Sequence, residues 1–300
     1  MGHMIVTGTA DGLYEIDLDG AVQRKALPGK QVRAVSGDWA IADDVLTSLS
    51  ADRTVSLPQG LVPRSILSEA GGTCMVGTSE ARLFSVGPDG AEPVASFDRI
   101  PTRSQWSTPW GGPPDTRSLG RGATGLLVNV HVGGVWRADK DDGDNDVWTE
   151  AVAPDRDAHQ VVAVDMTVAV AAGAGVGQSS DGGTTWTWSA QGLISPYSRA
   201  VAISQDWLLA SASTGPGASN GSLYRRPLDK PKQAFKTCGA KGDLPRRFPF
   251  IINTFELAAA GELVALGTPG GELYLSDDAG ESWRLLSDGL PGVHCVAFAE

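Results

Sequence analysis

The sequence has few cysteines, and their arrangement does not indicate cross-linking. The three that are present, Cys74, Cys238 and Cys295, are odd in number and widely separated. This pattern argues against a disulfide framework and against a cysteine metal cluster, and it agrees with a reducing compartment.

Long apolar segments are also missing. The longest apolar run, residues 161–177, is rich in glycine and interrupted by Asp165, so it is too broken to cross a bilayer. The N-terminus lacks the basic start and apolar stretch of a secretory signal, and Met1 to His3 read as a cloning remnant. We therefore expect a cytoplasmic protein without a membrane partner.

The chain also has fewer basic than acidic residues. The chain carries 24 Lys and Arg against 35 Asp and Glu, which gives a formal net charge of −11. An acidic protein repels phosphate backbones unless its basic residues are concentrated locally, so we expect no nucleic-acid partner.

Glycine is abundant, and it follows a repeat. The 38 glycines, together with few long helix-favouring runs, indicate an all-β chain of short strands and tight turns. Seven segments share a β-run, a Gly-rich turn and an apolar pair that begins the next run, at intervals of 32 to 52 residues and about 43 on average. Such an interval suits a propeller blade of four short strands. The second residues of the seven pairs are Tyr14, Leu46, Phe84, Trp136, Gly177, Tyr224 and Tyr274.

The two ends of the chain share one repeat. The 26 residues after Tyr274 and the 14 up to Tyr14 together amount to one more interval. Residues 293–300 read as a first strand with no unit after it, while the N-terminus begins directly at a second strand. We therefore predict one domain over residues 1–300: a monomeric, seven-bladed β-propeller of four-stranded antiparallel blades. The C-terminal strand pairs with the N-terminal blade and so closes the ring.

Two similar strings lie at the expected turns between third and fourth strands, SSDGGTTW at 179–186 and SDDAGESW at 276–283. They resemble the Asp-box, or bacterial neuraminidase repeat, of sialidase-like, sortilin-like and photosystem-assembly propellers. In that family the Asp accepts backbone N–H groups inside its own hairpin, the Gly takes a positive φ, and the Trp packs between sheets. The resemblance implies these structural roles for Ser179, Asp181, Gly183 and Trp186, and for Ser276, Asp278, Gly280 and Trp283.

Arginines recur at the starts of predicted first strands. Ligands of propellers usually sit on the face where first strands begin, because many loops converge there. We expect this mouth of the channel to carry Arg33, Arg64, Arg117, Arg199, Asn253 and His294. Two interpretations stay open: the guanidinium groups pair with acids and fasten blades together, or they converge on a carboxylate or phosphate ligand.

A long loop at residues 98–118 contains Trp106 and Trp110. Long loops without structure of their own often serve as lids. The two tryptophans either form a lid or pocket wall, or cover the junction between the third and fourth blades.

Histidine is scarce, and three of the four histidines are expected at the same mouth: His131, His159 and His294. Imidazoles gathered there would form structural hydrogen bonds, act as general acid and base, or hold a metal ion. We predict no cofactor, and a metal held by these three histidines stays an open alternative. The catalytic candidates are His131, His159, Asp115, Tyr197 and Glu256.

The acidic run at 139–150 partly mimics a calcium loop. It lacks glycine at the sixth position and a proper ligand at the fifth, so a solvated turn is favoured over a metal site.

The resemblance also raises the question of sialidase activity, which in this family needs an arginine triad, a Tyr nucleophile activated by Glu, and an Asp. Residues 99–101 resemble the family's Arg-Ile-Pro motif, but they lie at the end of the third predicted blade rather than near the first. We therefore favour a protein that binds, and as a further step acts on, a small anionic molecule. The alternatives are a non-enzymatic scaffold that binds a protein partner through its arginines, and a sialidase-like glycoside hydrolase.

Overall fold

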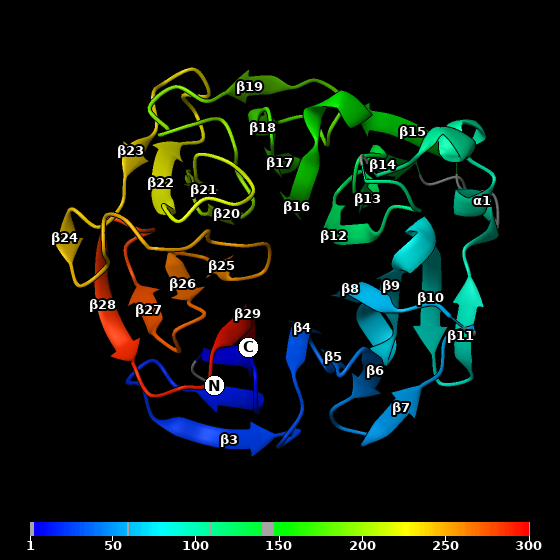
Figure 1. Cartoon of the computed structure of the whole chain (residues 1–300), viewed down its shortest axis with the longest axis horizontal. Helices are drawn as coiled ribbons and strands as arrows, with labels where there is room; N and C mark the ends of the chain where they lie inside the picture. Colours follow the sequence, from blue (N-terminus) through cyan, green and yellow to red (C-terminus); the bar gives the residue numbers. More distant parts are fainter. Residues whose placement is uncertain (1–2, 59, 109, 140–146, 300) are drawn as a thin grey trace.

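Seven sheets, each with four antiparallel strands, stand around a central channel in the computed structural model, which describes residues 3–58, 60–108, 110–139 and 147–299 (Figure 1). The first strand of each blade is innermost. This arrangement confirms the predicted all-β, seven-bladed propeller.

The strands follow the chain blade by blade. The first blade consists of β29 (Val293–Ala299), β1 (Met4–Thr9), β2 (Gly12–Ile16) and β3 (Val22–Ala26). The second consists of β4 (Val32–Ser36), β5 (Trp39–Ala42), β6 (Val45–Ser48) and β7 (Arg53–Val55). The third consists of β8 (Pro63–Ser68), β9 (Cys74–Thr78), β10 (Leu83–Gly87) and β11 (Gly90–Pro93). The fourth consists of β12 (Thr116–Gly122), β13 (Gly125–Val130), β14 (Gly134–Asp139) and β15 (Val147–Val152).

The remaining blades continue in the same order. The fifth consists of β16 (Ala158–Val164), β17 (Thr167–Ala172), β18 (Gly175–Ser179) and β19 (Thr187–Ser189). The sixth consists of β20 (Val201–Ser204), β21 (Trp207–Ala212), β22 (Ser222–Pro227) and β23 (Lys236–Thr237). The seventh consists of β25 (Leu257–Ala260), β26 (Leu263–Gly267), β27 (Leu273–Ser276), β28 (Ser282–Ser287) and β24 (Lys241–Gly242). Short helices occur at α1 (Ala95–Asp98), η1 (Ala70–Gly72), η2 (Ser79–Ala81), η3 (Pro101–Gln105) and η4 (Pro154–Arg156).

The ring closes through its two terminal strands. β29 pairs antiparallel with β1, with Met4 opposite Ala299 and Ile5 opposite Phe298. The first blade therefore takes its innermost strand from the end of the chain, as predicted. Closure leaves no open edge between the first and last blades.

The seventh blade has a fifth strand that the repeat did not predict. β24 pairs in parallel with the outer strand β28, with Lys241 opposite Ser282. Two contacts fix it: the Asp243 N–H donates to the Trp283 carbonyl at 2.8 Å, and Asp243 Oδ2 accepts the Leu285 N–H at 2.9 Å. The long connection between the sixth and seventh blades is thereby bound to the outside of the ring.

The hydrophobic core lies between neighbouring blades. Leu46 and Phe84, at equivalent positions of the second and third blades, are 1% and 3% exposed and share one cluster of buried side chains. Leu127 of the fourth blade packs in the same way with Val168 of the fifth. Because burial of each large apolar side chain contributes about 1.5–3 kcal/mol, the repeated apolar pairs hold the blades to one another.

In the hairpin that connects β27 and β28, an aspartate, a glycine and a tryptophan each have a defined structural role. Asp278 Oδ1 accepts the N–H groups of Glu281 at 2.9 Å and Ser282 at 2.8 Å. Gly280 has a φ of +84°, and a Cβ there would lie 2.7 Å from Leu209 of the preceding blade. Trp283 is 3% exposed and donates its Nε1–H to the Gly280 carbonyl. The hairpin is therefore a rigid turn that also fits against its neighbour.

The matching hairpin between β18 and β19 repeats this construction. Asp181 Oδ1 accepts the N–H groups of Thr184 at 3.1 Å and Thr185 at 2.8 Å. Hydrogen bonds from Thr185, then Ser179, lower the pKa of the Asp181 carboxyl well below its ordinary value. Ser179 pairs with Val168 at the start of β17, so the turn lies on the face opposite the starts of the first strands.

Two further findings concern the predicted environment of the chain. None of the helices in the described ranges has the length and apolar character needed to cross a lipid bilayer. All three cysteines are buried and free of disulfide bonds.

Candidate functional site

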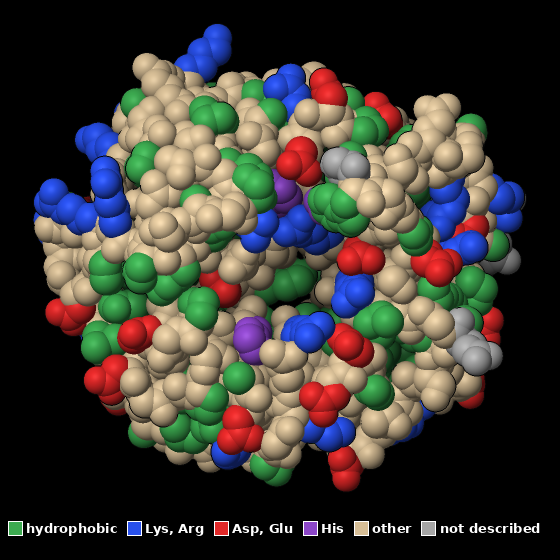
Figure 2. Space-filling model, viewed as in Figure 1, with side chains coloured by type: hydrophobic (Ala, Val, Ile, Leu, Met, Phe, Trp, Pro, Cys, Tyr) green, Lys and Arg blue, Asp and Glu red, His purple; other side chains and the backbone are tan. Residues whose placement is uncertain are grey.

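The channel mouth on the face where first strands begin is rich in basic side chains. Lys, Arg and His side chains gather around the central hollow in Figure 2. The channel itself is a cavity of about 290 Å³ with a largely apolar wall that includes Ile66, Leu119 and Val161. The charged groups are therefore concentrated at the mouth rather than along the channel.

Two of the four predicted arginines are neutralised by acids. Arg33 Nη1 lies 3.1 Å from Asp44 Oδ1, and its Nε and Nη2 donate to the Gln31 side chain. Arg64 Nε lies 3.3 Å from Asp115 Oδ2. For these two, the interpretation as ion pairs at the rim describes the observed contacts. The Asp115 carboxylate pairs with Arg64, while the Asp115 carbonyl oxygen accepts the His131 N–H at 2.9 Å.

The other two arginines have no acidic partner among the described residues. Arg199 donates from Nε to the Tyr197 hydroxyl at 2.9 Å and from Nη1 to Asn253 Oδ1 at 2.8 Å. The Arg117 guanidinium forms no hydrogen bond or ion pair within the described ranges. Desolvation lowers the pKa of Arg117, and the Arg199 charge lowers it further, while Tyr197 and the charges of Asp157 and Asp115 act in the opposite direction. Two like charges are thus held near each other at the mouth.

A pocket of about 420 Å³ opens at these two arginines. Its wall includes Trp110, Arg117, His131, His159, Tyr197 and Arg199. A neighbouring cavity of about 350 Å³ shares Trp110, Arg117 and His131 and extends to Arg64 and Thr254. Trp110 is 72% exposed, and its ring lies 5.4 Å from that of His131. We call the 420 Å³ cavity the mouth pocket.

Two histidines and one aspartate meet on the wall of the mouth pocket. Asp157 Oδ2 lies 3.3 Å from His159 Nε2, and Asp157 Oδ1 lies 3.8 Å from His131 Nε2. His159 is 1% exposed, and its Nδ1 lies 2.6 Å from the Ser198 carbonyl oxygen. The contact with His159 lowers the pKa of Asp157. Desolvation, together with the charge of Arg117, lowers the pKa of His131 to about 4.

His294 does not join the other two histidines. It lies on another part of the mouth, where Gln31 Nε2 donates to its Nε2 at 3.1 Å. The expected convergence of three imidazoles is thus reduced to two, and Asp157 takes the third position. Asp157 was not among the predicted site residues, although its place two residues before His159, immediately ahead of the same first strand, was a usable signal.

Glu256 is buried behind the mouth, with 4% of its surface exposed. Its Oε2 accepts the Asn253 N–H at 2.7 Å, and its Oε1 accepts Asn253 Nδ2 at 3.3 Å. Desolvation raises the pKa of Glu256 to about 7. Since Asn253 Oδ1 also accepts from Arg199, this glutamate supports Arg199 through Asn253 and does not reach the mouth pocket wall.

The two tryptophans of the long loop have different environments. Trp106 is 7% exposed and packs against Phe97 and Trp136, at centroid distances of 5.9 Å and 5.6 Å. It therefore covers the junction of the third and fourth blades, whereas Trp110 stands at the mouth pocket.

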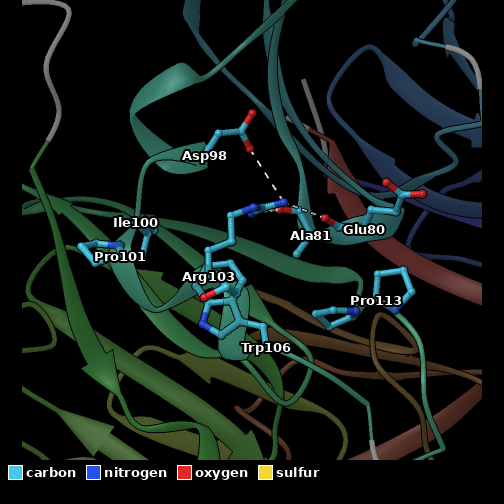
Figure 3. Close-up of a pocket in the computed structure, with 10 residues that line it drawn as sticks. Glu80, Ala81, Asp98, Ile100, Pro101, Arg103, Trp106 and Pro113 are labelled. Carbon is cyan, nitrogen blue, oxygen red and sulfur yellow. Dashed lines mark hydrogen bonds and ion pairs between the residues drawn. The ribbon is translucent and has the colours of Figure 1, made fainter.

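A separate cavity of about 520 Å³ beside this loop is lined by Trp106, Arg103 and Pro113 (Figure 3). Arg103 donates to the carbonyl oxygens of Ala81 at 2.6 Å and Glu80 at 2.7 Å. Its Nη2 also lies 3.8 Å from Asp98 Oδ1. Because this guanidinium already has partners, the cavity is a weaker candidate for anion binding than the mouth pocket.

The acidic run at 139–150 falls largely outside the described residues. Asp139 accepts from Arg137 Nε at 2.7 Å and from Thr149 Oγ1 at 2.8 Å. The predicted turn itself, residues 140–146, is not described.

Comparison with known proteins finds the fold in many solved structures and no match in sequence. No family model matches the chain, and no curated protein does. The computationally designed Ika8 protein is 14% identical, with a TM-score of 0.59, over 97% of this chain and 85% of that one. Virginiamycin B lyase from Staphylococcus aureus is 12% identical, with a TM-score of 0.58, over 97% of this chain and 88% of that one. U3-55K is 15% identical, with a TM-score of 0.53, over 86% and 84% of the two chains. At these identities the comparison supports the propeller fold alone.

Proposed function

We propose that the mouth pocket binds a small anionic molecule through Arg117 and Arg199. The observation that carries the proposal is Arg117, a half-buried guanidinium that forms no hydrogen bond or ion pair with any described residue and has a second arginine beside it. Like charges held this close are stabilised by an anion between them, and a guanidinium offers a carboxylate or phosphate two parallel hydrogen bonds.

The shape of the pocket favours a small ligand over a flat protein surface. A volume of about 420 Å³ falls within the usual range for small-molecule sites, and Trp110 provides an exposed aromatic wall. A recessed arginine pair is reached more easily by a carboxylate or phosphate on a small molecule than by a side chain from a broad interface. The same pocket holds His159, Asp157 and Tyr197, which would move protons if the bound molecule is also a substrate.

We also propose that the two similar hairpins are Asp-box turns with a structural role only. Their hydrogen bonds lie within the hairpin or reach the neighbouring blade, as the Asp278 and Gly280 contacts do, and they lie on the face away from the mouth pocket. The proposal includes one propeller domain over residues 1–300 and a cytoplasmic location, which is supported by the three free, buried cysteines.

Thermal shift and calorimetric titration with a panel of anions test the function. The panel contains inorganic phosphate, citrate, a nucleoside monophosphate and a sialic acid. At a ligand concentration one hundred times Kd, binding stabilises the folded state by about 2.7 kcal/mol and raises Tm by several degrees. Replacing Arg117 by Met removes the paired hydrogen bonds to the anion, and we expect affinity to fall about 10- to 100-fold.

Arg33→Met is the matched control, because Arg33 lies at the same mouth but is already paired with Asp44. It should bind the anion as the wild type does. If no anion in the panel shifts Tm, or if Arg117→Met keeps full affinity, the proposal is wrong. A protein that co-purifies with the wild type and is lost in Arg117→Met, without any effect of small anions, would favour the scaffold instead. Preference for the sialic acid would favour the sialidase-like alternative.

A further inference from the structure

The cluster of His131, Asp157 and His159 is built from two neighbouring blades. His131 directly follows β13 in the fourth blade. Asp157 immediately precedes β16 in the fifth blade, and His159 is the second residue of that strand. One potential ligand atom from each of the three side chains lies within 4.8 Å of the other two. Ligand atoms bound to one transition-metal ion at about 2.0–2.2 Å are separated by about 3–3.5 Å. The Asp157–His159 contact at 3.3 Å already meets this spacing.

The hydrogen bond of His159 determines which ring nitrogen faces the cluster. The Ser198 carbonyl oxygen, 2.6 Å from Nδ1, can only accept a hydrogen bond, so Nδ1 carries the proton. In the neutral ring, Nε2 then presents its lone pair to the Asp157 carboxylate at 3.3 Å. A backbone carbonyl that receives Nδ1–H while Nε2 stays free is the usual arrangement of a metal-binding histidine.

Two acceptors that face each other require a positive group between them. The lone pair of His159 Nε2 and the carboxylate of Asp157 repel unless a proton or a metal cation lies in the contact. His131 Nε2 faces the other oxygen of the same carboxylate at 3.8 Å, so Asp157 stands between both imidazoles. A single cation bound by all three groups satisfies both contacts. Without a metal, the same contacts need a proton on His159 Nε2 and the Nε2–H tautomer of His131.

The backbone around Asp157 is adapted to hold its carboxylate in place. Asp157 adopts a left-handed conformation, with φ of 53° and ψ of 61°, at the end of η4. Aspartate adopts this conformation more readily than most residues with a side chain, and Asp43, Asp44, Asp52 and Asp165 also do so in this chain. A Cβ at Gly173 would lie 2.7 Å from Asp157 Oδ2, so this glycine leaves the space that the carboxylate occupies.

We propose that His131, Asp157 and His159 bind one divalent transition-metal ion, with its open coordination positions facing the mouth pocket. Two imidazoles and one carboxylate suit first-row transition metals, while Ca²⁺ and Mg²⁺ prefer all-oxygen sites. The proposal goes beyond the anion site because its ligands are different side chains. Arg117 and Arg199 face the same pocket, so an anion that bridges the metal and the arginines would offset the repulsion between these positive charges.

Titration with Co²⁺ as a spectroscopic probe tests the metal site. The full-length protein is first stripped with a chelator and then transferred to a buffer free of phosphate and carboxylates. The result is thus independent of whether an anion binds at Arg117. We expect one Co²⁺ per chain, with visible absorption bands that report nitrogen and oxygen ligands, and displacement of Co²⁺ by Zn²⁺.

The variants Asp157→Asn and His131→Gln remove one ligand each with little change of volume. Each should weaken Co²⁺ binding by about 100-fold or more, since loss of a supporting outer partner alone costs about 10- to 100-fold. His294→Gln is the matched control, because His294 is at the mouth but outside the cluster. Circular dichroism melts of every variant establish that the fold is retained.

Three results would overturn the proposal. One is the absence of stoichiometric Co²⁺ or Zn²⁺ binding by the wild type. Another is equal affinity of the wild type and Asp157→Asn. The third is an NMR titration of the stripped wild-type protein that shows His159 doubly protonated at neutral pH in the presence of Zn²⁺, which would assign the contact with Asp157 to a shared proton.

Discussion

Burial of Glu256 predicts a pH-dependent stability that one substitution removes. The carboxyl is 4% exposed and its hydrogen-bond partners among the described residues belong to Asn253. The positive charge of Arg199 favours ionisation of Glu256, but Arg199 Nη1 donates its hydrogen bond to Asn253 and not to the carboxylate. The other titratable group that interacts with the Glu256 charge is Cys295. Burial therefore dominates and raises the pKa of Glu256 from 4.5 to about 7.

Because the pKa of Glu256 is raised in the folded state, the protein loses stability as pH rises. A carboxyl with a raised pKa in the folded state contributes stability that is complete below its unfolded pKa of 4.5 and is lost as pH rises through about 7. At 1.36 kcal/mol per unit, the shift corresponds to about 3 kcal/mol of unfolding free energy lost between pH 4.5 and pH 8. Glu256→Gln removes the titrating group while it keeps an oxygen that accepts the Asn253 N–H.

Urea unfolding at pH 4.5, 6 and 8 measures this effect. The difference in unfolding free energy between the wild type and Glu256→Gln should shift by about 3 kcal/mol in favour of the variant from the lowest to the highest pH. Glu262→Gln is the control, because Glu262 is exposed on the following turn and should show no such dependence. A wild type and a Glu256→Gln variant whose stabilities run parallel across this range would refute the reasoning.

Two further predictions concern the hairpins and the closure of the ring. Asp278→Ala removes the acceptor of two backbone N–H groups and should lower the free energy of unfolding by about 1–2 kcal/mol. The control is Asp277→Ala, at the exposed neighbouring position, which should leave Tm unchanged. Equal thermal melts for the two variants would contradict the structural role of the turn. A chain that ends at Gly292 lacks β29 and should fail to fold, but placing residues 293–299 ahead of Met4 through a short loop should restore a cooperative melt, because Ala299 lies opposite Met4 in the sheet. A truncated chain that melts like the wild type would rule out the closure as a requirement for folding.

The number of blades could be predicted from the sequence because packing between neighbouring sheets produces the repeat. Positions such as Leu46 and Phe84 are apolar because each must fill the space between neighbouring sheets, so their spacing records the number of blades. The terminal half-repeats likewise indicated the pairing of β29 with β1. β24 was not predicted, because a two-residue strand on an outer edge needs no periodic pattern.

The mouth could be predicted only in part. Sequence spacing placed the four arginines on one face, since each occupies the same position in its blade. It did not indicate that Asp44 and Asp115 pair with Arg33 and Arg64, or that the Arg117 guanidinium has no ion pair among the described residues, because those contacts depend on side-chain direction. For the same reason His294 was expected beside the other histidines, and Asp157 was overlooked.

The closure of the ring has a consequence for synthesis of the protein. β1 leaves the ribosome well before its inner neighbour β29, which lies nearly three hundred residues later in the chain. At about 5–20 residues per second, the exposed edge of β1 waits on the order of tens of seconds for its partner. During that time the nascent chain presents an unpaired strand edge, the kind of surface that chaperones cover. We expect the first blade to be the last to form, although most of it is made first.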